Sequence, residues 1–288
     1  MIYQVKNKVG LICEGGGTKG AYTSGALKAL VDNNLIFPYC VGISAGAENL
    51  LPYVSKQSER FAITGIDSAS NKGAVGLHPL WKEHSLFGIE ETCRFIEEKA
   101  PLNYKAFYES ETQLDIGLYD IEAGKVVYFS KDHLNEEQTL VKAACALLML
   151  AKPYKFEGKM YMDAGLIDMI AIEQSIRSGN NKHIFISTKE GNYKRKPAPS
   201  WQIRLAKILY RKYPHVARDL KIRHENYEKQ WSKVEELVNA GDAMVLRPSA
   251  DLGITRYTTD REKLIPWFEL GYQDTIARMD EIKKFIAS

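Results

Sequence analysis

The sequence predicts an α/β protein whose central strands run parallel, followed by a basic and mainly helical extension. Two short apolar runs, at 9–13 and 39–43, flank a helical pattern at 21–33. A strand–helix–strand unit of this length joins parallel strands. Strands and helices continue up to about residue 190. The composition then shifts, because residues 189–233 hold thirteen Lys and Arg against four Asp and Glu.

The elements of the first part follow from local patterns. The runs at 9–13 and 39–43 predict buried strands, and two asparagines end the helix at 21–33. Glycines punctuate residues 60–90, which predicts loop and short helix. Strands at 113–120 and 125–129 predict a hairpin. A helix at 137–151, a strand at 159–162, a helix at 169–178 and a strand at 183–187 complete this part.

The second part begins after a linker-like segment at 196–200, which contains two prolines. We expect helices at 201–213 and 215–239, a strand at 243–246 and a closing helix at 261–286. The chain is therefore divided into a catalytic domain at 1–190 and a basic, mainly helical extension at 191–288.

Composition excludes several classes of protein. Of the 288 residues, 45% are hydrophobic and 26% are charged, which is ordinary for a globular chain. The net charge of +3 is too small to indicate a nucleic-acid partner. The four cysteines form no paired motif, so we expect buried free thiols in a reducing compartment, with neither a metal site nor a cofactor.

No targeting or membrane segment is expected. The first ten residues lack the apolar core of a secretory signal. No apolar run approaches the ~18 residues needed to cross a bilayer. We therefore expect a cytoplasmic protein.

A glycine-rich loop follows the first strand and opens the first helix. It satisfies the pattern G-x-G-x-x-G and consists of Gly15, Gly16, Gly17, Thr18, Lys19 and Gly20. Glycines let backbone N–H groups approach a ligand, and a helix N-terminus favours negative charge. Such a loop binds a dinucleotide phosphate, forms an oxyanion hole, or is only a tight turn.

A G-x-S-x-G motif follows the second strand, with Ser44 at its centre. This pattern places a serine on a sharp strand-to-helix turn, where Gly42 and Gly46 relieve crowding. In a strand–helix–strand unit, both glycine motifs lie at the carboxyl edge of the sheet, where open α/β sheets bind ligands. A serine beside a row of backbone donors suits acyl transfer.

Two other uses of these motifs fit less well. A dinucleotide-binding site requires an acidic residue at the end of the second strand, and this sequence has Ser44 there. The serine of an α/β-hydrolase follows several strands, whereas this one falls within the first fifty residues.

A third motif, Asp163-Ala164-Gly165, follows the strand at 159–162. A carboxylate there either accepts the serine proton or forms an Asx turn. Together the three motifs resemble the patatin-like phospholipase family, whose G-G-G-x-[RK]-G loop, G-x-S-x-G serine and D-G-[GA] turn follow in this order. The resemblance covers roughly residues 9–190 and implies a three-layer α/β/α fold with a mainly parallel central sheet.

The resemblance also implies roles for individual residues. Ser44 matches the nucleophile and Asp163 its general base, in a dyad that needs no histidine. Backbone N–H groups around Gly16, Gly17 and Thr18 match the oxyanion hole. The family hydrolyses acyl esters of phospholipids, lysophospholipids or neutral lipids, so a lipid ester is the expected substrate.

Some positions depart from the family pattern. Lys19 takes the place of the usual Arg, where its charge supports the loop or attracts an anionic head group. Ala164 replaces a glycine, and the proline expected after Gly165 is absent. Cys145 and Leu148 stand where Ser and Pro are common. Both catalytic side chains are present, so these departures bear on rate and substrate more than on the chemistry.

We therefore expect a serine lipid acyl hydrolase that forms an acyl-enzyme. Two alternatives stay open: a lipid-binding or interaction protein on a catalytically idle fold, and a nucleotide-dependent enzyme that uses the glycine loop. A triad would require His183, His215 or His224, which we expect to be structural or at the surface.

The predicted helix at 201–213 is amphipathic. Trp201, Leu205, Ile208 and Leu209 form an apolar stripe, and three cations flank it, Arg204, Lys207 and Arg211. The stripe either packs on the body of the protein or lies in an anionic membrane interface.

Overall fold

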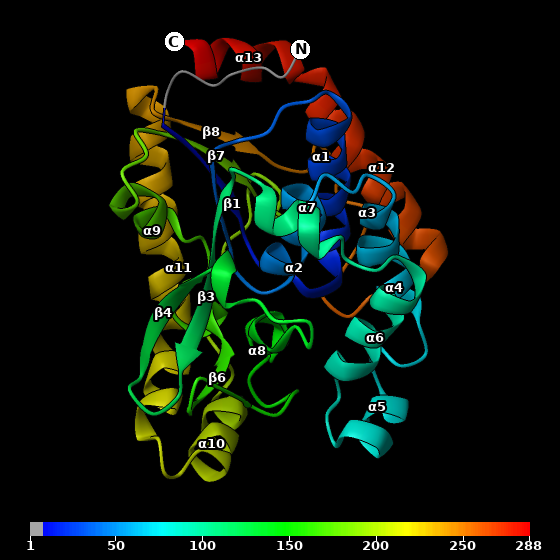
Figure 1. Ribbon diagram of the computed structural model, residues 1–288. Coiled ribbons are helices and arrows are strands. Elements are labelled where there is room, and N and C mark those ends of the chain that lie inside the picture. The colour runs from blue at the N-terminus through cyan, green and yellow to red at the C-terminus, as the bar shows by residue number, and fades with distance from the viewer. Residues whose placement is uncertain (1–7) are drawn as a thin grey trace.

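The computed structural model describes residues 8–288 (Figure 1). Residues 1–7, which include most of the N-terminal stretch in which no signal is expected, lie outside the described residues.

A mainly parallel sheet forms the centre of the molecule. The strand order is β5-β6-β3-β2-β1-β7-β8, and β4 pairs with β3. Parallel pairing joins β1 to β2 and β7, β2 to β3, and β7 to β8. The strands are β1 (Val9–Cys13), β2 (Tyr39–Gly42), β3 (Gln113–Asp120), β4 (Lys125–Ser130), β5 (Tyr154–Phe156), β6 (Lys159–Asp163), β7 (Lys182–Ile186) and β8 (Ala243–Leu246).

Helices cover both faces of this sheet, because successive side chains of each buried strand point to opposite faces. Leu11 of β1 packs in the core with residues of α1 and α12, whereas Ile12 packs with residues of α9 and α11. Figure 1 shows α1 and α12 on one side of the sheet and α9 and α11 on the other. The predicted three-layer α/β/α fold is confirmed. The larger helices are α1 (Gly20–Asp32), α2 (Ala45–Val54), α6 (Ile89–Lys99), α10 (Ser200–Leu209), α11 (Pro214–Ala240), α12 (Arg261–Ala277) and α13 (Met279–Ala287).

The shorter helices lie mostly between α2 and β7. They include a π-helix, η2, which interrupts the segment after α2. Their bounds are η1 (Gly17–Lys19), α3 (Arg60–Ala62), η2 (Ile63–Asp67), α4 (Ser68–Ser70), α5 (Leu77–Glu83), α7 (Tyr104–Glu109), η3 (Lys131–His133), α8 (Thr139–Cys145), η4 (Ala164–Leu166) and α9 (Ile172–Arg177).

The C-terminal part is tied closely to the first part. Strand β8 extends the central sheet beside β7, and Trp267 of α12 packs on Tyr22 of α1 with ring centroids 5.5 Å apart. Gly25 lets the two helices approach, because a Cβ atom there would collide with the carbonyl oxygen of Phe268. The division near residue 190 stays a prediction, and both sides of it contribute to one sheet.

Several predicted elements have different bounds in the structure. The helix expected at 137–151 ends at Cys145, where the chain turns so that the Ala146 carbonyl accepts a hydrogen bond from the Asp163 N–H at 3.0 Å. The closing helix breaks at Arg278, whose side chain bonds to Glu281 and to the carbonyl oxygen of Val245. Long-range contacts of this kind leave no local sequence pattern.

Other differences are smaller. The helices expected at 169–178 and 201–213 are shorter, at Ile172–Arg177 and Ser200–Leu209. Strand β5 and helices α6 and α7 are not among the predicted elements. Cys13, Cys40 and Cys93 are buried and Cys145 is partly buried, and all four are free thiols.

Candidate active site

Ser44 stands on a strained turn between β2 and α2. Its backbone has φ 56° and ψ −132°, a region that non-glycine residues adopt rarely and at a cost in energy. The turn is tight enough that a Cβ atom on Gly46 would collide with the carbonyl oxygen of Cys13 at the end of β1. The serine is 5% exposed and precedes the N-terminus of α2. The strand-to-helix turn expected from the G-x-S-x-G motif is therefore present.

Asp163 ends β6 and lies next to Ser44. One carboxylate oxygen accepts a hydrogen bond from the Gly165 N–H at 2.7 Å, and hydrogen bonding by the Ser44 hydroxyl lowers the pKa of the same carboxyl. Burial raises the pKa of the Asp163 carboxyl, and both hydrogen bonds and the charges of Arg223 and Arg256 oppose that rise. The structure thus brings together the serine and the carboxylate predicted from separate motifs.

The glycine loop lies against Ser44 on the other side. Gly17 has φ +57°, and a Cβ atom there would lie 2.6 Å from the carbonyl oxygen of Arg256, so this position requires glycine. The N–H groups of Gly15, Gly16 and Gly17 have no acceptor among residues 8–288. The Thr18 N–H donates to the Arg256 carbonyl at 3.3 Å. Of the three donors expected from the family pattern, Gly16 and Gly17 are therefore the available ones.

A buried ion pair holds this loop in place. The Lys189 ammonium bonds to the Glu14 carboxylate and to the Gly15 carbonyl oxygen, both at 3.2 Å. Burial lowers the pKa of Lys189 to about 8, and the Glu14 charge opposes that fall. Because a trans peptide directs its carbonyl and N–H in opposite directions, the Gly16 N–H points away from Lys189. Sequence patterns do not signal this pair, because its members are 175 residues apart.

Other motif residues have structural partners. Lys19 pairs with Glu190 at 3.1 Å, so its charge is already balanced by a carboxylate. The Gly20 carbonyl accepts a hydrogen bond from the Asn49 side chain at 3.1 Å. Ala164 is buried and does not have positive φ, so alanine fits this turn without backbone strain.

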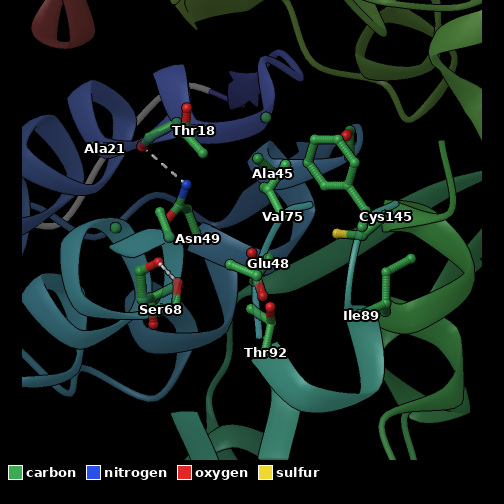
Figure 2. A pocket seen from close by; sticks show the side chains of 18 of the residues that line it. Thr18, Ala21, Ala45, Glu48, Asn49, Ser68, Val75, Ile89, Thr92 and Cys145 are labelled. Atoms are coloured by element: carbon green, nitrogen blue, oxygen red, sulfur yellow. Dashed lines mark hydrogen bonds between the residues drawn. The ribbon is translucent and has the colours of Figure 1, made fainter. Parts of the chain in front are cut away.

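A small apolar pocket opens on one side of Ser44. Its volume is about 90 Å³, and Ala45, Val75, Ile89 and Cys145 contribute to its wall (Figure 2). Glu48 also lines it, and burial raises the pKa of this carboxyl to about 7, although the charge of Arg60 opposes the rise. Every residue that lines this pocket comes from the first 147 residues of the chain.

A cationic cavity of about 200 Å³ opens on the other side of Ser44. Gly17, Ser44 and Leu147 border both spaces, so the serine lies between them. The charged side chains of the cavity are those of Asp163 and five cations, Lys19, Lys189, Arg195, Arg223 and Arg256. Only the excess of cations in residues 189–233 hints at Arg195 and Arg223 from the sequence, and nothing there hints at Arg256.

No histidine lines either space within the described part of the chain. His183 is buried and bonds to the Ser175 hydroxyl at 2.9 Å, and burial lowers its pKa to about 4. His215 bonds to the carbonyl oxygen of Ile121 at 2.8 Å. His224 is partly buried on α11. Residues 8–288 hold no group of three or more His, Cys, Asp or Glu arranged for a metal ion.

A strained serine facing a glycine loop at the carboxyl edge of a parallel sheet defines an α/β protein built like a serine hydrolase. Residues 11–176 match the patatin-like phospholipase family, and residues 213–287 match a domain family of unknown function. The chain therefore belongs to the patatin-like phospholipase family, as the motifs predict. This membership supports activity as a lipid hydrolase. The two matched ranges fall on either side of residue 190.

Two solved structures resemble the fold. VipD from Legionella pneumophila is 13% identical, with a TM-score of 0.50, over 96% of this chain and 67% of that one. Human GIVD cytosolic phospholipase A2 is 12% identical, with a TM-score of 0.46, over 98% of this chain and 59% of that one. Comparison with curated protein sequences found no match.

Proposed function

We propose that the protein is a serine lipid acyl hydrolase that acts through a Ser44–Asp163 dyad. The observation that carries this proposal is that Ser44 and the buried Asp163 carboxylate, whose pKa the serine hydroxyl lowers, line one cavity with the glycine loop, where the Gly16 and Gly17 N–H groups have no acceptor among residues 8–288. A nucleophile, a base and oxyanion donors around one cavity are the parts that acyl transfer needs.

The reaction then has two halves. The Ser44 oxygen attacks the ester carbonyl carbon while Asp163 takes the hydroxyl proton, and the Gly16 and Gly17 N–H groups stabilise the oxyanion. The bond to the alcohol breaks, and Asp163 returns the proton to the leaving oxygen. Asp163 next takes a proton from water, which attacks the acyl-enzyme. The fatty acid leaves and the proton returns to Ser44.

The environment of Asp163 suits a base that works without histidine. Burial raises the pKa of this carboxyl, so it accepts a proton more readily than an exposed aspartate does. The charges of Arg223 and Arg256 oppose that rise and favour the ionised form of the carboxyl. A direct carboxylate base needs both properties.

Labelling with a fluorophosphonate probe tests this function. We expect wild type to be labelled, and Ser44→Ala to be folded, unlabelled and inactive on p-nitrophenyl esters and phospholipids. The loss of a nucleophile costs on the order of 10⁶ in kcat. A Ser44→Ala variant that keeps a large share of the wild-type rate would refute the dyad. An unlabelled, inactive wild type that still binds lipid would favour the idle interaction protein. Stabilisation by micromolar NAD or ATP would favour the nucleotide site.

We also propose that the protein contacts an anionic membrane through α10 and α5. Trp201 and Ile208 of α10 are 62% and 70% exposed, and Trp81 of α5 is 83% exposed. Both helices lie at the lower end of the molecule in Figure 1. Arg204 and Lys207 of α10 are also exposed. Exposed Trp beside cations suits a membrane interface. No helix in residues 8–288 is long and apolar enough to span a bilayer.

Vesicle co-sedimentation tests this contact. Each cation near an anionic surface adds roughly 1 kcal/mol, screened by salt. We expect Arg204→Glu/Lys207→Glu/Arg211→Glu to weaken binding to anionic vesicles at low salt while a soluble short-chain ester is hydrolysed as before. The matched control is Lys99→Glu/Lys105→Glu/Lys284→Glu, which reverses three exposed lysines elsewhere. Equal sedimentation of the two variants would show that the cations of α10 do not contribute to membrane binding.

A further inference from the structure

We propose that Arg195, Arg223 and Arg256 bind a phosphate group on the alcohol side of the substrate. The enzyme then selects acyl esters whose leaving alcohol carries a phosphate. This inference rests on the proposed function, and it assigns a specificity site to residues outside the three motifs.

The three arginines lack the partners that balance the other cations of the cavity. Lys19 pairs with Glu190, and Lys189 pairs with Glu14. Within residues 8–288 no carboxylate oxygen lies within 4.0 Å of a side-chain nitrogen of the three arginines, Arg195, Arg223 and Arg256. Unbalanced cations around a concave site attract an anion.

Several N–H donors of these guanidinium groups have no hydrogen-bond partner among residues 8–288. The Nε of Arg195 is buried and has no hydrogen-bond partner, although burial of an unpaired donor costs free energy. Its guanidinium lies over the Tyr227 ring, 4.9 Å from the ring centroid, which fixes its position. The Arg256 guanidinium makes no hydrogen bond with any residue from 8 to 288, whereas the Arg223 Nε donates to the Gly165 carbonyl at 2.6 Å.

Mutual repulsion between these cations also favours the binding of an anion. Burial, together with the charges of Arg195 and Arg256, lowers the pKa of Arg223 to about 9. A bound dianion would relieve that repulsion. Arginine is the side chain best suited to phosphate, because its planar donors match two phosphate oxygens at once.

The position of Ser44 orients the substrate. The acyl chain needs an apolar space, and the apolar pocket lies on the side of Ala45, Val75 and Ile89. With the acyl chain in this pocket, the alcohol lies on the opposite side of the serine, in the cationic cavity. When the bond between the acyl carbon and the alcohol oxygen breaks, the departing alcohol takes the Asp163 proton and stays beside the three arginines.

Short-chain substrates that stay monomeric test the assignment without an interface. We compare kcat/KM for an acyl glycerol phosphate, the matching acyl glycerophosphocholine and the matching monoacylglycerol. Wild type should prefer the phosphate monoester to the neutral ester by tenfold or more. Arg195→Gln should lower this ratio by about ten- to a hundredfold, in line with one lost charged hydrogen bond. Arg195→Lys should recover part of it.

Arg195 is the best position for the test because it is not among the groups that shift the pKa of Asp163. Arg177→Gln is the matched control, since this arginine is exposed on α9 and lines neither space. It should leave the ratio unchanged. If Arg195→Gln does not fold, as judged by circular dichroism, Arg256→Gln replaces it in the same assay.

A second arm separates a lipid head group from free phosphate. Calorimetry measures the binding of inorganic phosphate and of glycerol 3-phosphate to Ser44→Ala, and we expect Arg195→Gln in that background to weaken both. Binding without any preference for phosphorylated esters would reduce the site to one for free anions and overturn the assignment. So would a ratio that Arg195→Gln leaves unchanged. Because binding is measured without turnover, a failed dyad leaves this arm intact.

Discussion

The apolar pocket and the cationic cavity meet at Ser44, but different parts of the chain build them. Residues before position 148 line the whole apolar pocket. The cavity also has the glycine loop and Asp163, yet four of its five cations come from residues 189–256. The pocket is small and mostly apolar, whereas the cavity holds five cations and one carboxylate.

The residues proposed for catalysis and those proposed for substrate selectivity therefore come from different parts of the chain. The groups that would break the ester lie in the first part of the chain, within the range that matches the family. The three arginines proposed to bind the phosphate of the leaving alcohol lie beyond residue 188. Because β8 and α12 fasten the second part to the sheet and to α1, its arginines are held beside the dyad rather than on a separate module. Substitutions on each side should therefore fail in different ways.

The largest effect is expected at Asp163, the proposed base, which lines the cationic cavity. Asp163→Asn keeps the shape of the side chain and removes its capacity to accept a proton. It should lower kcat by about 10⁴ or more, and combination with Ser44→Ala should add little, because the dyad acts as a unit. Steady-state kinetics on a p-nitrophenyl ester measure both. The control His224→Asn should keep most of its activity, and an inactive but folded His224→Asn would indicate a triad.

The glycine loop comes next, because it borders both the pocket and the cavity. Gly17→Val places a branched side chain at φ +57°, where its Cβ would lie 2.6 Å from the Arg256 carbonyl oxygen. Displacement of the Gly16 and Gly17 N–H groups should lower kcat by ~10²–10³. Gly241→Val is the matched control, since Gly241 has φ +78° and no atom near its absent Cβ. If both variants lose the same activity, general strain rather than the loop is responsible.

A pH profile probes the cavity side alone. Arg256 lowers the pKa of the Asp163 carboxyl, so Arg256→Gln should raise that pKa further above its ordinary value. The base works only when ionised, so activity falls as pH falls through this pKa. The acidic limb of kcat/KM should therefore move to higher pH in the variant. Arg177→Gln serves again as the control. An acidic limb that does not move would show that Arg256 does not act on the base.

The smallest effect is expected on the pocket side, at Glu48. Burial raises its pKa to about 7 in the folded protein, so the folded state holds this proton more tightly than the unfolded chain does. Stability should therefore fall as pH rises toward 7. Glu48→Gln removes the charge and should stabilise the protein at pH 8 by about 1–3 kcal/mol, with little effect near pH 4.5. Urea unfolding at the two pH values measures this. Equal shifts at both would contradict a buried carboxyl.

The sequence by itself predicted what depends on short segments. The parallel βαβ unit, the turn at Ser44 and the loop at 15–20 follow from patterns of a few residues, and the family match bears out the fold. The order of the motifs along one edge of the sheet places Ser44 near the glycine loop. The same patterns misjudged the ends of α8 and α12, where contacts with distant residues end the helices.

Only the tertiary structure decided which side chains surround the dyad. The Glu14–Lys189 pair, the stacking of Arg195 on Tyr227 and the contact between Thr18 and Arg256 each join residues far apart in the chain. Local patterns report how one segment folds, whereas the charge balance of a cavity depends on which segments the sheet brings together. The excess of cations in residues 189–233 was visible in the sequence, but only the fold places Lys189, Arg195 and Arg223, together with the distant Arg256, around the cavity beside Ser44.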